Sequence, residues 1–131
     1  MREMKRTTWT NLAVCDPHDA AVLEITTKNV VARREKDRPL CCTNHFRSDA
    51  LATSKRCWRY DIFEKENGAK KRTVKDVARA MHAVNQGQRT VQTMVFEPAT
   101  LKLHIGFGDG PSSARPLKLL DLKTLFAEAA K

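Results

Sequence analysis

The chain has 131 residues and a mass of 14.8 kDa, the size of one small domain. Its hydrophobic fraction of 41% and charged fraction of 30% exclude a disordered tail, a collagen repeat and a coiled coil. No apolar run approaches the roughly 20 residues that cross a bilayer, and none follows the basic N-terminus as a secretory signal requires. We therefore expect a cytoplasmic chain without a membrane segment.

Short strands are predicted along the first third of the chain. Asp16-Pro17-His18-Asp19 has the composition of a tight turn, so the apolar runs on either side of it form a hairpin. A further apolar run, Leu40–Thr43, is predicted as a strand that ends in Asn44-His45-Phe46. The other predicted strands are Asn11–Cys15, Ala21–Thr26 and Val30–Arg34.

Two helices follow. Residues 49–66 place Leu51, Trp58 and Ile62 on one helical face, with Asp49 as the N-cap and Gly68 as the terminator. The second helix is predicted to begin after Thr73, which caps it, and to end at Gln86-Gly87. Its apolar positions repeat with the spacing of a packed helix: Val74, Val77, Ala78, Met81 and Val84.

The C-terminal part returns to strand patterns. Residues 90–96 are rich in branched side chains, and in residues 101–107 apolar and polar positions alternate, which predicts one buried and one wet face. A last apolar run covers residues 117–122, and Asp121 is expected to cap a short helix through Leu125 and Phe126.

The order of strands, two helices and strands predicts an α+β fold in a single domain, residues 1–131. The two helices are expected to cover one face of a largely antiparallel sheet, which leaves its other face for a partner layer.

The cysteines and histidines allow two kinds of chemistry. The spacing of the pairs Cys15/His18 and Cys41/His45 is permitted in a tetrahedral zinc site, but the turns of known zinc ribbons are missing. Cys41 or Cys42 near His45 is a conceivable nucleophile, although no orienting group or oxyanion donor is marked. We expect free thiols and surface histidines, with no metal or cofactor.

A third constellation joins Asn44, at the predicted strand end, to Ser54, Arg56 and Arg59 on the predicted first helix. An asparagine amide can donate to a developing oxyanion, and arginines on one helix face can bind or hold a carboxylate. Residue chemistry alone favours the simpler interpretation, in which Asn44 caps a turn and the arginines are solvated.

The order of several motifs, however, resembles a known family. These are Thr43-Asn44-His45-Phe46, the Ser54-x-Arg56-x-x-Arg59-Tyr60 stretch, residues 90–98 and the glycine-containing segment from Leu103 to Gly108. Together they are similar to the C-terminal part of the acyl-coenzyme A:6-aminopenicillanic-acid acyltransferase-like hydrolases. That family is related to the choloylglycine hydrolases in the N-terminal nucleophile superfamily.

The resemblance implies an αββα sandwich and an enzyme that cleaves or transfers acyl groups at linear amide bonds. In the family an N-terminal cysteine is the nucleophile, and its own α-amine is the base. By position, Asn44 would be the oxyanion-hole asparagine, and Arg56 or, less directly, Arg59 would be the arginine near the active site.

The family's nucleophile stands upstream of the region matched, and the four cysteines of this chain are internal. We therefore expect the C-terminal segment of a hydrolase that is inactive alone. It is expected to associate with a missing N-terminal half or with itself. The assembled protein would then act on a small acyl amide or thioester. Two alternatives remain open. One is a basic module for nucleic acid or another anion, suggested by the net charge of +9. The other is a non-catalytic scaffold oligomer.

Overall fold

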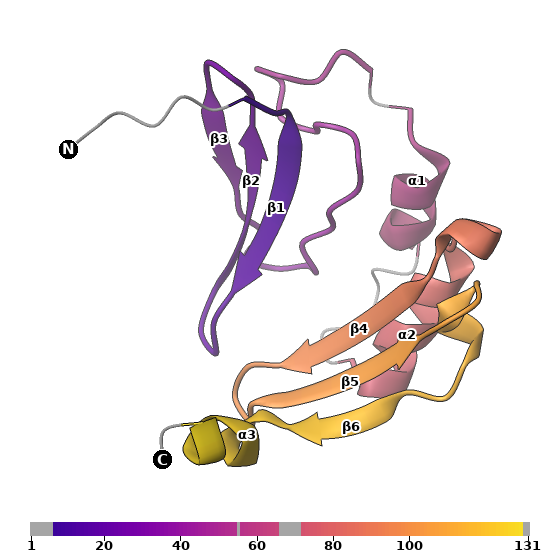
Figure 1. Cartoon of the computed structure of the whole chain (residues 1–131). Helices are drawn as coiled ribbons and strands as arrows, with labels where there is room; N and C mark the ends of the chain where they lie inside the picture. Colours follow the sequence, from indigo (N-terminus) through magenta and orange to yellow (C-terminus); the bar gives the residue numbers. More distant parts are fainter. Residues whose placement is uncertain (1–6, 55, 66–71, 130–131) are drawn as a thin grey trace. The chain divides into compact units, whose positions relative to one another are not determined.

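The computed structural model describes residues 7–54, 56–65 and 72–129 (Figure 1). Internal contacts divide the chain into two compact units, Met1–Lys70 and Lys71–Lys131, which we call unit 1 and unit 2. Each unit contains one three-stranded antiparallel sheet. The predicted mixed α+β class is confirmed. The order of the elements alone predicts one antiparallel sheet, whereas the structure has two separate sheets.

The sheet of unit 1 runs in the order β1-β2-β3, with β1 at Thr10–Cys15, β2 at Ala20–Ile25 and β3 at Val30–Arg33. The predicted turn joins β1 to β2, because the Asp16 carboxylate accepts hydrogen bonds from the backbone N–H groups of His18 and Asp19. Cross-strand register pairs Asn11 with Glu24. The three predicted strands and their hairpin are confirmed.

The segment between β3 and the first helix has no strand and no long helix in the residues described. The predicted strand at 40–43 is therefore wrong, and the predicted helix at 49–66 is shortened to α1, Trp58–Lys65. Cys57 precedes α1 and its carbonyl accepts from the N–H of Asp61, so Asp49 is not the N-cap. Gly68, the predicted end of this helix, lies outside the described residues.

The sheet of unit 2 runs in the order β4-β5-β6, and Figure 1 shows α2 along one face of it. The helix has the capping box that the sequence predicts: the Thr73 hydroxyl accepts from the Asp76 N–H, and the Asp76 carboxylate accepts from the Thr73 N–H. The elements of this unit are α2 at Val74–Ala83, η1 at Gly87–Arg89, β4 at Gln92–Glu97, β5 at Lys102–Phe107, η2 at Ser112–Ala114, β6 at Lys118–Asp121 and α3 at Leu122–Ala129.

The covered face of this sheet is not the one that the alternation in residues 101–107 predicts. Thr93 and Val95 of β4 and Gly106 of β5 are buried, and α2 packs against β4. The apolar side is the open one within unit 2: Met94 and Phe96 are 48% and 43% exposed. Apolar patterning alone cannot identify which face a helix covers, because both faces of β4 carry apolar side chains.

Asp121 caps the last helix as expected, since its carboxylate accepts from the N–H of Lys123. Among the described helices, none has the length and apolar character that a membrane span requires.

Candidate functional site

A pocket of about 180 Å³ lies in unit 1 beside the start of β1. Aromatic side chains form one wall, where the rings of Trp9 and Phe46 stack with centroids 6.1 Å apart. Most of the other lining side chains are polar, and two of them, Asn44 and Ser54, are candidate site residues from the sequence. The lining residues are Trp9, Thr10, Asn44, His45, Phe46, Leu51, Thr53 and Ser54.

The backbone on both sides of Asn44 is held by one side chain of β1. The Nδ2 group of Asn11 donates to the carbonyl oxygen of Thr43 at 2.7 Å and to that of His45 at 3.1 Å. These two carbonyls belong to the residues immediately before and after Asn44. The backbone at Asn44 is thus fixed although it lies in neither a helix nor a strand.

Glu24 of β2 holds the next part of the same loop. Its side chain is completely buried, and its carboxylate accepts from the backbone N–H groups of Arg47 and Ser48 at 2.7 and 3.0 Å. The Ser48 hydroxyl donates at 2.6 Å, and Arg33 of β3 donates from Nε at 2.6 Å. Arg33 also reaches the carbonyl of Cys41, at the start of the loop.

Burial by itself raises the pKa of the Glu24 carboxyl. The hydrogen bonds from Ser48, Arg47 and Arg33 outweigh burial, so the pKa lies below its ordinary value. Glu24 is therefore ionised at neutral pH and keeps its full capacity to accept from the loop.

Helix α1 and the residue before it are joined to the loop by two side-chain contacts. The Arg47 guanidinium lies over the Tyr60 ring at 3.8 Å from the centroid. The buried Cys57 thiol lies 3.6 Å from the Thr43 hydroxyl. Burial tends to raise the pKa of Cys57, but hydrogen bonds from Tyr60, Thr43 and Arg59 lower it overall.

The Asn44 side chain itself is exposed and lines the pocket. Within the described ranges 7–54, 56–65 and 72–129, no residue forms a hydrogen bond with its amide. The loop thus presents a free amide donor on a backbone held at the carbonyls before and after it. That combination suits a hydrogen bond to a ligand or a developing charge.

The predicted arginines are placed differently from the expectation. Arg56 precedes α1 and is exposed, whereas Arg59 is in the first turn of α1 and is half-buried, so the prediction that they share a helix face is wrong. Neither lines the pocket. The backbone N–H of Arg56 donates to the hydroxyl of the pocket residue Ser54 at 3.2 Å.

No cysteine is among the described residues that line this pocket. The four thiols are free, and burial raises the pKa of Cys42. Cys15 is exposed at the end of β1 and lines a different, shallow pocket. In the part of the chain that the structure describes, no three histidine, cysteine or acidic side chains are grouped to hold a metal ion.

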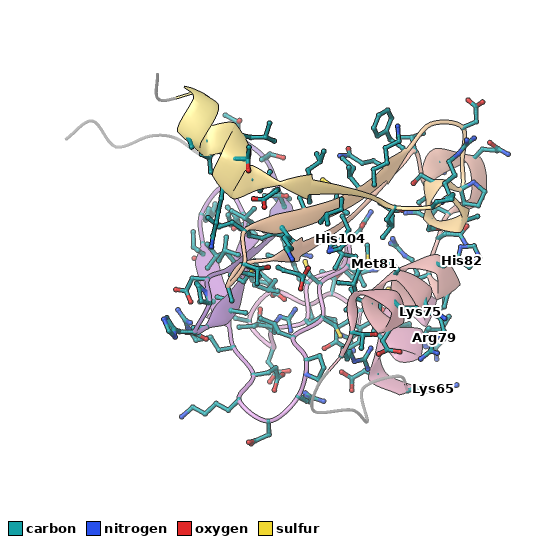
Figure 2. All side chains as sticks on the ribbon, turned by 90° about the horizontal axis from the view of Figure 1, so that it is seen from below. Lys65, Lys75, Arg79, Met81, His82 and His104 are labelled. Carbon is teal, nitrogen blue, oxygen red and sulfur yellow. The ribbon has the colours of Figure 1, made fainter. Side chains whose placement is uncertain are left out.

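Basic side chains gather on α2, where Lys75, Arg79 and His82 are spaced along one side of the helix (Figure 2). Two of them already have partners: Arg79 pairs with Asp76 at 3.3 Å, and His82 Nδ1 lies 2.9 Å from the Ser113 hydroxyl. Elsewhere Arg33, Arg34 and Arg38 each pair with a carboxylate. The positive charge is distributed and partly neutralised.

Asn11, Glu24 and Arg33 were not identified as site residues from the sequence. A signal was available for Glu24, which is an acidic residue inside an apolar strand and shares a strand face with Val22. A carboxylate at such a position needs hydrogen-bond donors when that face of the strand is buried. Those donors are backbone groups of a distant loop, which a strand pattern does not reveal.

Comparisons with protein-family models, with curated proteins and with solved structures find no match to this chain.

Proposed function

We propose that this chain is the C-terminal segment of a hydrolase or acyltransferase for linear amide bonds, in which Asn44 supplies the oxyanion donor. The observation that carries the proposal is the free Asn44 amide, exposed at a pocket on a backbone held by Asn11. A preorganised donor of this kind stabilises the tetrahedral intermediate of acyl transfer without reorganising during the reaction.

The nucleophile in this proposal comes from another segment, because no described residue lining the pocket is a cysteine. Its thiolate attacks the amide carbonyl carbon, a C–S bond forms, and the carbonyl oxygen gains the negative charge that Asn44 stabilises. Collapse of this intermediate breaks the C–N bond, and the amine leaves with the proton that the nucleophile's α-amine took up from the thiol. Water, or an acceptor amine in a transferase, then releases the acyl group.

The substrate belongs in the pocket beside Asn44. Its volume of about 180 Å³ and its stacked Trp9 and Phe46 rings suit a small acyl group better than a long chain. Arg56 is proposed to act at the edge of this site, since its backbone is bonded to the pocket residue Ser54.

The proposed αββα sandwich agrees with the open faces of both sheets. In unit 1, Leu12, Val14 and Val30 are 48%, 43% and 49% exposed on one face of the sheet. In unit 2, Met94 and Phe96 are similarly exposed. Apolar faces of this kind are covered by another sheet in a sandwich, which is also why the chain is proposed to need a partner segment or self-association.

The test is an amidase assay on the chain alone and on the chain co-expressed with the polypeptide that the DNA upstream of its coding region encodes. Acyl para-nitroanilides with acetyl, phenylacetyl and lauroyl groups serve as probes. The proposal expects a cysteine-led segment upstream and hydrolysis only by the pair, fastest with a short acyl group. Unrelated upstream sequence, or a pair that hydrolyses none of the probes, contradicts it.

A further inference from the structure

Two residues that face each other across β1 and β2 contact the loop on both sides of the Asn44 amide. Asn11 and Glu24 are register partners in the sheet, so their side chains point to the same face. Asn11 bonds the carbonyls of Thr43 and His45, and Glu24 bonds the N–H groups of Arg47 and Ser48. One side chain supplies donors, and the other supplies acceptors.

The hydrogen bonding of Asn11 is one-sided. Its Nδ2 group donates twice to the loop, while its Oδ1 atom is buried and has no partner among the residues described. A buried amide oxygen without a partner is unfavourable, so the favourable hydrogen bonds of this side chain are the two that it donates. Its two acceptors are the carbonyls adjacent to Asn44.

We propose that Asn11 and Glu24 are positioning residues that fix the Asn44 amide for its role as oxyanion donor. The inference rests on the proposed function of Asn44. An oxyanion donor must stand within a few tenths of an ångström of the developing charge to be effective, and a residue outside regular structure has no helix or strand to hold it there. Here the sheet provides the rigidity, and this pair transmits it to the loop.

The pair is expected to act as a unit, because its two members hold adjacent parts of one loop. Removing the Asn11 amide releases the two carbonyls next to Asn44, whereas replacing the Glu24 carboxylate leaves the Arg47 and Ser48 N–H groups short of acceptors. Asn11 is only half-buried, so Asn11→Ala is the variant more readily accommodated by the fold.

The first experiment measures amide hydrogen exchange by NMR on the full chain, which needs no partner segment. In Glu24→Gln we expect the Arg47 and Ser48 amides to exchange at least about a hundredfold faster, while the amides of β2 remain more protected than those of the loop. In Asn11→Ala the Asn44 side-chain amide signals are expected to shift and broaden. Controls are Glu64→Gln, at an exposed ion pair, and Asn29→Ala, in an exposed turn. The proposal is overturned if the loop amides of folded Glu24→Gln exchange at the unmodified rate and the Asn44 side-chain signals of folded Asn11→Ala are unchanged.

The second experiment measures kcat and KM of the same variants in the pair of segments described above. Positioning predicts a fall in kcat of about ten- to a hundredfold in Asn11→Ala with little change in KM. It also predicts that the double variant Asn11→Ala/Asn44→Ala falls no further than Asn44→Ala alone. Equal loss in Asn29→Ala, or additive loss in the double variant, contradicts positioning. If the unmodified pair is inactive, the proposed function fails, and the exchange data alone decide whether the two residues hold the loop.

Discussion

The Nε atom of Arg33 lies 2.6 Å from a carboxylate oxygen of Glu24, whose side chain is fully buried. Replacing one member of such a pair leaves the other charge without compensation, which typically costs about 3–5 kcal/mol. We therefore expect Glu24→Gln to lower the free energy of unfolding of unit 1 by about that amount. Urea titration followed by tryptophan fluorescence measures it, because Trp9 and Trp58 both belong to unit 1.

The matched control is Glu64→Gln. Glu64 pairs with Arg38 at the surface, and Arg38 keeps a second partner in Glu35. Exposed pairs contribute at most about 1 kcal/mol, so this variant is expected to unfold almost as the unmodified chain does. Equal losses in the two variants would show that the buried network has no special importance.

The stability of unit 1 is expected to fall in acid because of the same carboxyl. The pKa of Glu24 is lowered from 4.5 in the folded chain, so its contribution is complete above about pH 4.5 and is lost as the pH falls through the folded-state value. Among the described residues, Arg33 donates to this carboxylate from its side chain, and the charge of Glu24 contributes to the raised pKa of Cys42.

Urea titrations between pH 6 and pH 3 test this dependence. The unmodified chain should lose more stability below pH 4.5 than Glu24→Gln does, because the variant has no carboxyl to protonate at this position. Asp16 has a lowered pKa in unit 1 too, but it is present in both proteins and cancels in the comparison. Parallel pH profiles for the two proteins would contradict the assignment.

Much of the fold could be predicted from the sequence where local signals agree with the structure. The turn at Asp16 and the capping box of Thr73 and Asp76 are local hydrogen-bond motifs, and the structure confirms both. The predicted helix at 49–66 is too long because the apolar periodicity includes Leu51, which lies in a turn before Cys57 in the structure. Local periodicity does not account for the side-chain contacts that hold residues 41–48 as a loop.

The site could be predicted only in part for the same reason. Asn44 and Ser54 were identified and line one pocket. The Asn11 and Glu24 contacts with the loop span sequence separations of 23 to 34 residues. Such contacts depend on how the sheet and the loop pack, and residue patterns along a single strand carry no information about them.

Any side chain at Gly110 in unit 2 is predicted to lower stability. A Cβ atom there would meet the Gly87 carbonyl oxygen at 2.7 Å and Gln88 backbone atoms at 2.8 Å. We expect Gly110→Ala to cost about 3 kcal/mol, because backbone atoms on both segments must shift. Thermal unfolding followed by circular dichroism measures the change.

The comparison variant is Gly87→Ala. Gly87 has a φ of +58° but open space around it, so an alanine there meets only backbone strain of about 1 kcal/mol. A larger loss at Gly87 than at Gly110 would contradict the close approach of these two segments.

Thr73 is predicted to stabilise α2 through its capping box. Thr73→Ala removes the acceptor for the Asp76 N–H and should cost about 1 kcal/mol, which corresponds to a fall in Tm of about 4–8 °C for a unit of this size. Thr124→Ala, on an exposed position of α3, is the control and is expected to change Tm little. Equal changes in Tm would mean that the cap contributes nothing.

The central claim is that the Asn44 amide stabilises the oxyanion of an acyl-transfer reaction. Its most direct test is kcat for Asn44→Ala in the pair of segments, with Asn29→Ala as the control. The account predicts a fall of about a hundred- to a thousandfold in kcat with KM nearly unchanged, and unaltered kinetics in the control. A kcat for Asn44→Ala within about twofold of the unmodified pair would contradict it.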